Sequence, residues 1–269
     1  MSDKIPSLIK WSGSKRLLAH KISSYFPPYK RYIEPFLGGG SILFINTHNS
    51  AIANDIYRPL IELWTLIQKD VSKTISSYKL RWNKLQNNLP DYYYYVRERF
   101  NKTNDPLDLL FLSRTCVNGI IRFNSAGHFN NSFHLSRTGM TPDNFAPIAR
   151  SWSDKIKNVK FTNHDYKTIL GNLRKGDFVY LDPPYLNSKN RYIENLDFNV
   201  FLKQLDRLNI KGIPYALSFD GSRNGKNFNL DFPKDFYKRK ILIETGYSPV
   251  TKVLNGKNHQ VKEALYLNY

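Results

Sequence analysis

The chain has 269 residues, of which 41% are hydrophobic and 14% aromatic. It can therefore build one substantial core, or a core domain with a smaller insert, and it is neither a short module nor a disordered tail. Forty Lys and Arg against 22 Asp and Glu give a formal net charge of +18, which favours a polyanionic partner, either nucleic acid or an anionic membrane surface. A genome that favours Lys, Asn and Tyr codons throughout would produce a similar excess.

The composition also limits the compartment and the metal chemistry. No run of eighteen apolar residues exists, and residues 1–6 lack the apolar stretch of a signal peptide. We therefore expect a soluble, cytoplasmic protein without a membrane partner. The single cysteine, Cys116, excludes an internal disulfide and a cysteine-based metal cluster. The six histidines show no spacing typical of zinc ligands, so we expect no metal.

The first sixty residues predict two helices, two strands and a glycine turn. Apolar residues at helical spacing predict a helix over 15–25. A strand over 32–34 leads into a glycine turn at 38–40, and a second helix is expected to begin over 41–45. A second strand over 51–53 follows.

The middle of the chain is helical and then loses its periodicity. From Pro59 to about Leu112 apolar residues recur at helical spacing. Between Arg114 and Pro147 no period is apparent, and Asn, Gly, Ser, Arg and Phe dominate. Because long loops inside compact chains usually carry function, we predict a functional loop region here.

Strands and helices alternate again in the last third of the chain. The expected elements are strands near 159–161, 178–181 and 215–219, a helix over 198–208, and two closing strands near 241–244 and 264–269. This alternation predicts a mostly parallel α/β sheet. The closing pair, with Asn255-Gly256 between its strands, predicts an antiparallel hairpin at the edge.

The segment Asp182-Pro183-Pro184-Tyr185 carries the clearest chemical signal. It follows an apolar strand, and ligands of open parallel sheets bind outside the carboxyl ends of the strands. Two prolines fix the backbone and remove two N–H donors, which leaves carbonyl acceptors. The Asp182 carboxylate and the Pro183 carbonyl could each accept one N–H of an amino group, while Tyr185 offers a face for base stacking. A simple turn after a strand remains the alternative.

Several separated motifs occur in one order and together resemble the Dam-type class of DNA adenine methyltransferases. The motifs are Lys10-Trp11-Ser12-Gly13-Ser14-Lys15, Glu34-Pro35-Phe36-Leu37-Gly38-Gly39-Gly40 and Asp182-Pro183-Pro184-Tyr185, with further similarity at Phe100-Asn101-Lys102, Asp105-Pro106, Asn118-Gly119-Ile120-Ile121-Arg122-Phe123-Asn124, Gly127 and Phe129-Asn130. The resemblance spans most of the chain.

This resemblance implies a fold and a division of the chain. We expect a Rossmann-like sheet of the S-adenosylmethionine-dependent methyltransferase type, formed by residues 1–58 and 156–269. A helical and loop-rich target-recognition insert is expected over 59–155. The catalytic residues would be Asp182, Pro183, Pro184 and Tyr185, and the partner would be double-stranded DNA.

The resemblance also implies the contacts of S-adenosylmethionine. It assigns them to Trp11, Lys15, Glu34, Pro35, Phe36, Gly38, Gly40, Asp55, Asp165, Tyr166 and Asp182. The chemistry of the residues supports some of these roles independently of the resemblance. Glycines let the backbone approach a ligand closely, and an acid that ends the second strand is well placed to hold ribose hydroxyls. For Asp55, the cap of a helix that begins near Pro59 is the structural alternative.

A target-contacting loop is expected within the region without periodicity. Arg122 could pair with guanine, Asn118 or Asn124 with adenine, and Phe123 could wedge into the base stack, with Arg114 and Arg137 flanking the loop. A plain loop fastened by Asn and Gly turns is the alternative. GATC-methylating members of the family have Pro-Phe-Gly after the Phe-Asn pair, whereas here Asn131-Ser132-Phe133-His134 follows, so the recognition sequence stays open.

The expected activity is transfer of a methyl group to N6 of an extruded adenine. N4 of cytosine presents a similar amino group and remains the nearest alternative. Methylation at C5 of cytosine would need a thiolate beside the ring, and Cys116 lies far from Asp182 in sequence. A catalytically idle nucleic-acid binder, RNA as the substrate, and a restriction, phage or housekeeping setting also remain open.

Overall fold

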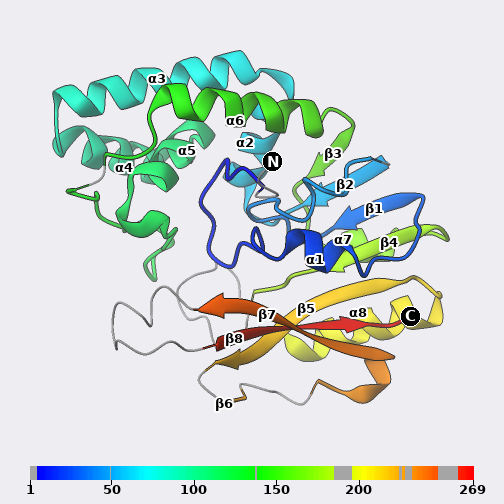
Figure 1. The fold of residues 1–269 in the computed structure, drawn as a ribbon. Coiled ribbons are helices and arrows are strands. Elements are labelled where there is room, and N and C mark those ends of the chain that lie inside the picture. Colours follow the sequence, from blue (N-terminus) through cyan, green and yellow to red (C-terminus); the bar gives the residue numbers. More distant parts are fainter. Residues whose placement is uncertain are drawn as a thin grey trace.

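A single mixed sheet runs through the molecule and separates groups of helices (Figure 1). The computed structural model describes residues 5–48, 50–136, 138–184, 196–223, 226–227, 232–247 and 260–269. Two predicted site residues, Tyr185 and Arg137, and the predicted turn at Asn255-Gly256 lie outside these ranges.

The sheet has the strand order β3-β2-β1-β4-β5-β8-β7, and a short strand β6 pairs with β5. The strands are β1 (Arg31–Glu34), β2 (Ser50–Asn54), β3 (Val159–Thr162), β4 (Asp177–Leu181), β5 (Tyr215–Arg223), β6 (Lys226–Asn227), β7 (Arg239–Tyr247) and β8 (Gln260–Leu267). Strands β1 to β5 are parallel, whereas β8 is antiparallel to both β5 and β7. The predicted Rossmann-like sheet with an antiparallel closing hairpin is confirmed, and β7 forms its outer edge.

The strand order reverses between β1 and β4, which are direct neighbours. The chain builds β2 and β3 on one side of β1, and returns to build β4 and β5 on the other. In open α/β sheets, ligands bind outside the carboxyl ends of the strands at such a reversal. Glu34 ends β1 and Asp182 directly follows β4, so two acids stand at this point.

Five long helices form an insertion between β2 and β3. They are α2 (Arg58–Lys69), α3 (Val71–Asn87), α4 (Asp91–Thr103), α5 (Pro106–Thr115) and α6 (Pro142–Lys155), with a short 3-10 turn η1 (Val117–Gly119) after α5. Figure 1 shows them gathered at one end of the sheet. Among the described residues, no helix is long and apolar enough to cross a membrane.

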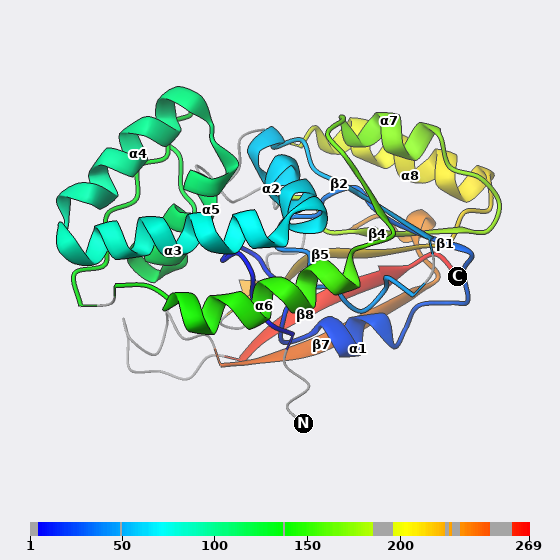
Figure 2. The ribbon, with the colours of Figure 1, turned by 90° about the horizontal axis from the view of Figure 1, so that it is seen from above.

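The remaining helices cover the two faces of the sheet. Figure 2 shows α7 (Tyr166–Gly171) and α8 (Phe198–Ile210) on one face, and α1 (Ala19–Ser23) on the other. A short 3-10 turn, η2 (Lys234–Phe236), precedes β7. Alternate residues of β4 serve the two faces: Val179 packs with α8, while Tyr180 belongs to the core shared with α1 and the insert. One hydrophobic core is therefore continuous from the sheet into the insert.

Some local predictions were wrong. Helix α1 is limited to Ala19–Ser23. Residues 41–45 form turns rather than a helix, because few residues remain before β2 and the Asn46 side chain donates to the Ile42 carbonyl.

The predicted loop region also ends earlier than expected, because α6 begins at Pro142. Thr141 caps this helix and Pro142 occupies its first turn, where a missing N–H is harmless. Pro147, where the predicted loop region ended, lies inside α6. Helix α7 was not predicted at all.

Candidate active site

The carboxyl ends of β1, β2 and β4 open into one cleft of about 320 Å³, which is continuous with solvent. Every residue predicted to contact the cofactor lines this cleft, and so do Pro184 and Phe123. The segments that meet here are 11–15, 34–42, 54–57, 164–167 and 196–200. Residues scattered over the whole chain are thus brought to one place at the strand reversal.

The glycine turn after β1 allows a tryptophan to close one wall of the cleft. Gly38 has a φ of +49°, and a Cβ at this position would lie 2.8 Å from the Trp11 ring. Gly40 has a φ of +67°, and a Cβ there would lie 3.1 Å from Trp64. At both positions the positive φ favours glycine, and the neighbouring tryptophan rings leave little room for a side chain.

Asp55 is held rigidly beside this turn. Its two carboxylate oxygens each accept one backbone N–H, from Gly38 at 3.0 Å and from Tyr57 at 3.0 Å. Burial raises the pKa of Asp55 to about 6, although these two hydrogen bonds lower it. A carboxylate has about four lone-pair sites, so this geometry leaves acceptor capacity toward the cleft.

Asn54, which the sequence analysis did not single out, ties the strand ends together. Its Nδ2 donates to the carbonyls of Pro35 at 3.0 Å and His164 at 2.9 Å. Its Oδ1 accepts from the Thr162 hydroxyl and from the His164 N–H, both at 2.9 Å. One buried amide therefore fixes the loops that carry the glycine turn and Asp165.

Aromatic rings form the floor beyond Asp55. The rings of Phe36 and Tyr166 lie 5.2 Å apart, and Phe201 from α8 supports Tyr166 at 6.0 Å. Asp165 caps α7 by accepting from the Lys167 N–H at 2.8 Å, and it also pairs with the Lys167 ammonium at 3.1 Å. Asp165 is therefore engaged in local structure at the edge of the cleft.

Charged groups concentrate around Lys15. Its Nζ lies 3.0 Å from Oδ1 of Asp182 and 3.2 Å from Oε1 of Glu263. Burial raises the pKa of Asp182 to about 6, while Lys15 lowers it and Glu263 raises it. Glu34 is buried nearby and accepts from the Tyr32 hydroxyl at 2.7 Å; burial holds the pKa of Glu34 well above its ordinary value.

Among the described residues of the target loop, Phe123 reaches the cleft. Phe123 is buried, lines the cleft, and meets the Tyr57 ring edge-on at 5.5 Å. The Tyr57 hydroxyl is buried without a hydrogen-bond partner among the described residues. Arg122 is exposed, and its Nε donates to Oδ1 of Asn130 at 2.9 Å.

Three other loop residues have different environments. Asn118 is exposed and adopts a φ of +56°. Asn124 is exposed, and its Oδ1 accepts from the Ala126 and His128 N–H groups and so builds a turn. The expectation that Arg114 flanks the loop with a side chain available to DNA was wrong. Arg114 is only 5% exposed, its guanidinium donates to the Ser7 carbonyl, and burial lowers its pKa to about 10.

Sequence reasoning missed Asn54, Tyr57 and Glu263. An Asn directly before an Asp at a strand end was a usable signal for Asn54. Glu263 gave no local signal, because its proximity to Lys15 depends on the pairing of β8 with β5.

Comparison with known proteins identifies the family. The sequence model of the D12 class N6 adenine-specific DNA methyltransferases matches residues 11–207. The Type II methyltransferase M.MjaIII of Methanocaldococcus jannaschii is 27% identical over 98% of this chain and 97% of its own length. The DNA adenine methylase of Haemophilus influenzae is 31% identical over 66% of this chain, and the match spans 63% of that protein. The DNA N-6-adenine-methyltransferase of Escherichia phage P1 is 31% identical over 66% of this chain and 24% of its own length. The chain therefore belongs to the D12 class of N6 adenine-specific DNA methyltransferases.

Proposed function

We propose that the cleft binds S-adenosylmethionine, and that Asp182 and the Pro183 carbonyl receive the amino group of an adenine extruded from duplex DNA. One observation carries the proposal: Asp182 lies in the same cleft as Asp55 and the glycine turn, above the strand reversal. A donor held along β1 and β2 and an acceptor held beside β4 would thus meet at Asp182.

The residues present fit an adenosyl group with an amino-acid tail. Asp55 keeps acceptor capacity for two ribose hydroxyls, and Gly38 and Gly40 line the same cleft. Phe36 and Tyr166 offer apolar ring surface for the adenine of the donor, beside Asp165. Glu34 and Pro35 line the wall between these rings and the strand reversal.

Trp11 and Lys15 line the same cleft, and Lys15 stands beside Asp182, where we place the methionine portion and its carboxylate. When bound, this group supplies a methyl carbon made electrophilic by its sulfonium. Among the described residues, the two carboxylates of Asp182 and Glu263 share one ammonium, that of Lys15, so a cationic donor is favoured over a neutral one.

Asp182 and Pro183 supply the geometry for the transfer. The nitrogen of an adenine amino group is a weak nucleophile because its lone pair is delocalised into the ring. When the Asp182 carboxylate accepts one N–H and the Pro183 carbonyl accepts the other, electron density stays on the nitrogen. These two hydrogen bonds also orient the nitrogen lone pair toward the methyl carbon. One proton leaves the nitrogen after transfer, and Asp182 is the group positioned to accept it first.

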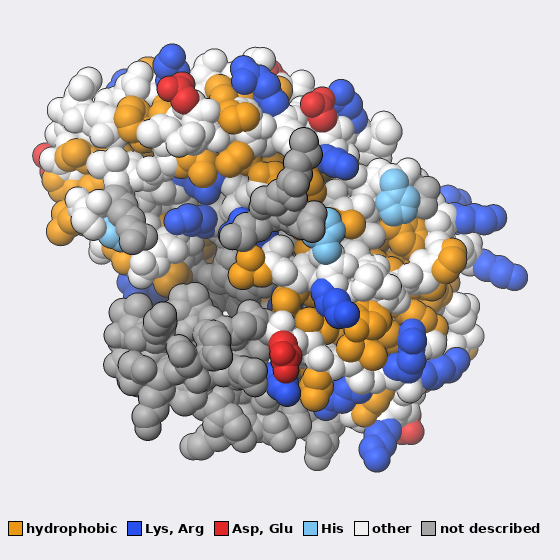
Figure 3. Space-filling model, in the orientation of Figure 1, with side chains coloured by type: hydrophobic (Ala, Val, Ile, Leu, Met, Phe, Trp, Pro, Cys, Tyr) orange, Lys and Arg blue, Asp and Glu red, His pale blue; other side chains and the backbone are white. Residues whose placement is uncertain are grey.

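Recognition of DNA is assigned to the insert, residues 59–155, and above all to its loop. Arg122, Asn118 and Asn124 are exposed there, and Arg122 has the planar fork that suits guanine. Arg137 keeps its predicted role but lies outside the described residues, as does the stacking role of Tyr185. On the face shown in Figure 3, Lys and Arg side chains outnumber Asp and Glu, which suits a phosphate backbone.

The test is product analysis with a matched pair of proteins. Wild type and Asp182→Asn are incubated with S-adenosylmethionine and unmethylated duplex DNA, and the digested nucleosides are separated by mass spectrometry. We expect N6-methyladenine from wild type only. N4-methylcytosine as the product would overturn the base assignment, and equal transfer by Asp182→Asn would overturn the assigned site. Structured RNA at the same salt concentration tests the competing substrate.

A further inference from the structure

Lys15 is held between two carboxylates that come from different parts of the sheet. Asp182 follows β4, at 3.0 Å from the ammonium, and Glu263 lies on β8, at 3.2 Å. The side chains of Lys15 and Glu263 are 6% and 13% exposed, so both distances refer to groups largely removed from water. Glu263 also lies outside the region 11–207 that the family model matches.

The antiparallel strand β8 gives Glu263 its place. It pairs with Gly221 of β5 on one side and with Ile243 of β7 on the other. The β5–β8 pairing shifts its register between Ser218 and Gly221, directly beside this position. Strand β5 in turn neighbours β4. The carboxylate of Glu263, near the end of the chain, therefore reaches the ammonium of Lys15, near its beginning.

The charges explain why a second carboxylate matters. If the buried Lys15 ammonium paired with Asp182 alone, it would occupy lone pairs of the Asp182 carboxylate. The carboxylate would then be a weaker acceptor for an amino group. The second carboxylate, that of Glu263, shares the Lys15 ammonium and so weakens the attraction between Lys15 and Asp182. It also anchors a flexible side chain, since the lysine stem has four carbons and many rotamers.

Four ionisable groups from different elements interact with the Asp182 carboxyl. They are Lys15 from the N-terminal loop, Glu34 from β1, Tyr180 from β4 and Glu263 from β8. Of these, Lys15 and Glu263 are the two whose charges act directly on the Asp182 carboxyl, and they act in opposite directions.

We propose that Glu263 is a positioning residue for methyl transfer, which holds the Lys15 ammonium in place and shares its charge, so that Asp182 remains a strong acceptor for the adenine amino group. The proposal rests on the catalytic role of Asp182 proposed above. Glu263 itself touches neither substrate nor donor in this scheme.

The experiment compares Glu263→Gln with wild type in the full chain. We expect kcat to fall about 10- to 100-fold, the cost typical of a misplaced reacting group, with a smaller change in KM for the donor. Because Glu263 raises the pKa of Asp182, its loss should also move the acid limb of the kcat/KM profile for DNA to lower pH. Glu263→Asp should recover part of kcat and of the profile.

Glu244→Gln is the matched control. Glu244 lies on β7 beside the same hairpin, its side chain is 64% exposed, and its carboxylate is 3.8 Å from Lys262. We expect kcat and the pH profile of this variant to equal those of wild type. An altered profile in the control would show a general effect of charge and overturn the specific role of Glu263.

The remaining outcomes separate this proposal from the one on which it rests. If Asp182→Asn is inactive while Glu263→Gln keeps the wild-type kcat and profile, Glu263 has no positioning role. A lower kcat with an unmoved acid limb would make the role of Glu263 merely structural and overturn the proposal as well. If Asp182→Asn is fully active, the assigned site fails first. Should Glu263→Gln not fold, Glu263→Ala, which also removes the charge, is measured in the same way, and an unmoved acid limb in that variant would also contradict the proposal.

Discussion

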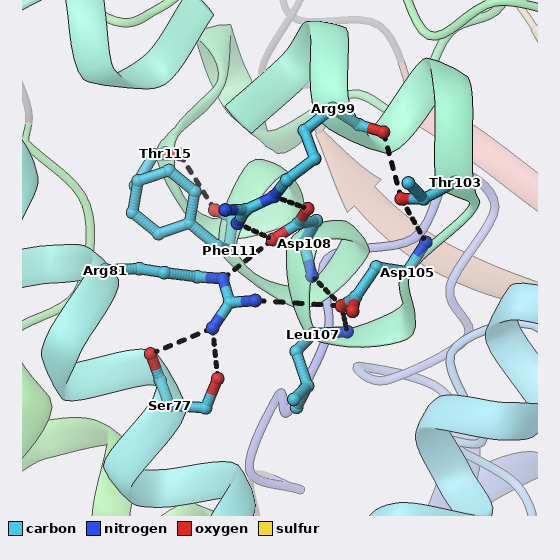
Figure 4. A network of polar contacts seen from close by, with 9 residues as sticks. All are labelled: Ser77, Arg81, Arg99, Thr103, Asp105, Leu107, Asp108, Phe111 and Thr115. Carbon is cyan, nitrogen blue, oxygen red and sulfur yellow. Dashed lines mark hydrogen bonds and ion pairs between the residues drawn. The ribbon is translucent and has the colours of Figure 1, made fainter. Parts of the chain in front are cut away.

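Two buried clusters of charge in this protein are balanced in opposite ways. In the insert, Asp108 is fully buried and accepts from Arg81 Nε at 2.7 Å, Arg99 Nε at 2.7 Å and Arg99 Nη2 at 2.5 Å (Figure 4). One anion thus has two guanidinium partners, and Arg81 also reaches Ser77 and lies 3.7 Å from Asp105. In the cleft, one ammonium serves both Asp182 and Glu263.

The difference indicates what each cluster is for. The network around Asp108 fastens α3, α4 and α5 with bidentate, charge-assisted bonds and leaves little for a ligand to add. Around Lys15 the described residues place two carboxylates on one ammonium, and burial raises the pKa of both Asp182 and Asp55. A site that is electrostatically incomplete by itself is suited to complete its balance with a bound cation, which the proposed sulfonium donor provides.

The same substitution at the centre of each cluster should therefore have opposite consequences. Asp108→Asn removes the charge that two guanidinium groups share, and we expect the free energy of unfolding to fall by about 3 to 5 kcal/mol. Urea unfolding measures this loss. At a temperature where the variant stays folded, methyl transfer per folded molecule should remain near wild type, and a large loss of transfer there would contradict a purely structural role.

Asp182→Asn should do the reverse. We expect methyl transfer to fall about 100- to 1000-fold, as when a preorganised polar contact in an active site is removed. Folding should not suffer, because the amide keeps the shape and spares the desolvation of a charge. An unfolding free energy several kcal/mol below that of wild type would show that the two clusters are alike after all.

The pH dependence sharpens the contrast further. The pKa of Asp182 is about 6 in the folded protein, above the ordinary value of 3.8, so its ionised form costs stability. That cost is absent at pH 4 and complete above about pH 6. Wild type should therefore be less stable than Asp182→Asn by about 1 to 3 kcal/mol at pH 7, and the difference should vanish toward pH 4.

Activity should change in the opposite direction over the same range. The proposed acceptor must be ionised, so kcat/KM for DNA at saturating donor should fall about tenfold per unit of pH below about 6. Saturating donor removes the contribution of Asp55, whose pKa is also raised to about 6. A flat profile down to pH 5 would exclude Asp182 as the titrating group.

The sequence predicted what depends on neighbouring residues. The strands of the sheet, the glycine turn and the acids at the strand ends follow from local patterns, and the cleft assembles residues that those patterns had marked. Helix α6 was hidden by Pro147, although Thr141 and Pro142 marked its start.

Long-range packing could not be predicted in this way. Arg114 is buried because the segment around Ser7 lies against it. Glu263 meets Lys15 because β8 enters between β5 and β7 in one register. No periodicity or motif encodes either contact, so both required the folded structure.

Substitution of Asp55 should have the smallest of the expected effects. It also shows where the comparison of the Asp108 and Asp182 clusters ends, because Asp55 belongs to neither. Its carboxylate is held by two backbone N–H groups rather than by a cation, and Asp55→Asn can keep only one of these bonds with its remaining oxygen. If the ribose hydroxyls of the donor bind there, KM for the donor should rise about 10-fold, the value of one charge-assisted hydrogen bond, while kcat changes less. Initial rates at varied donor concentration separate the two constants. A fall in kcat without a change in KM would instead place Asp55 with Asp182 at the reacting end of the cleft, because only an interaction made in the transition state has that signature.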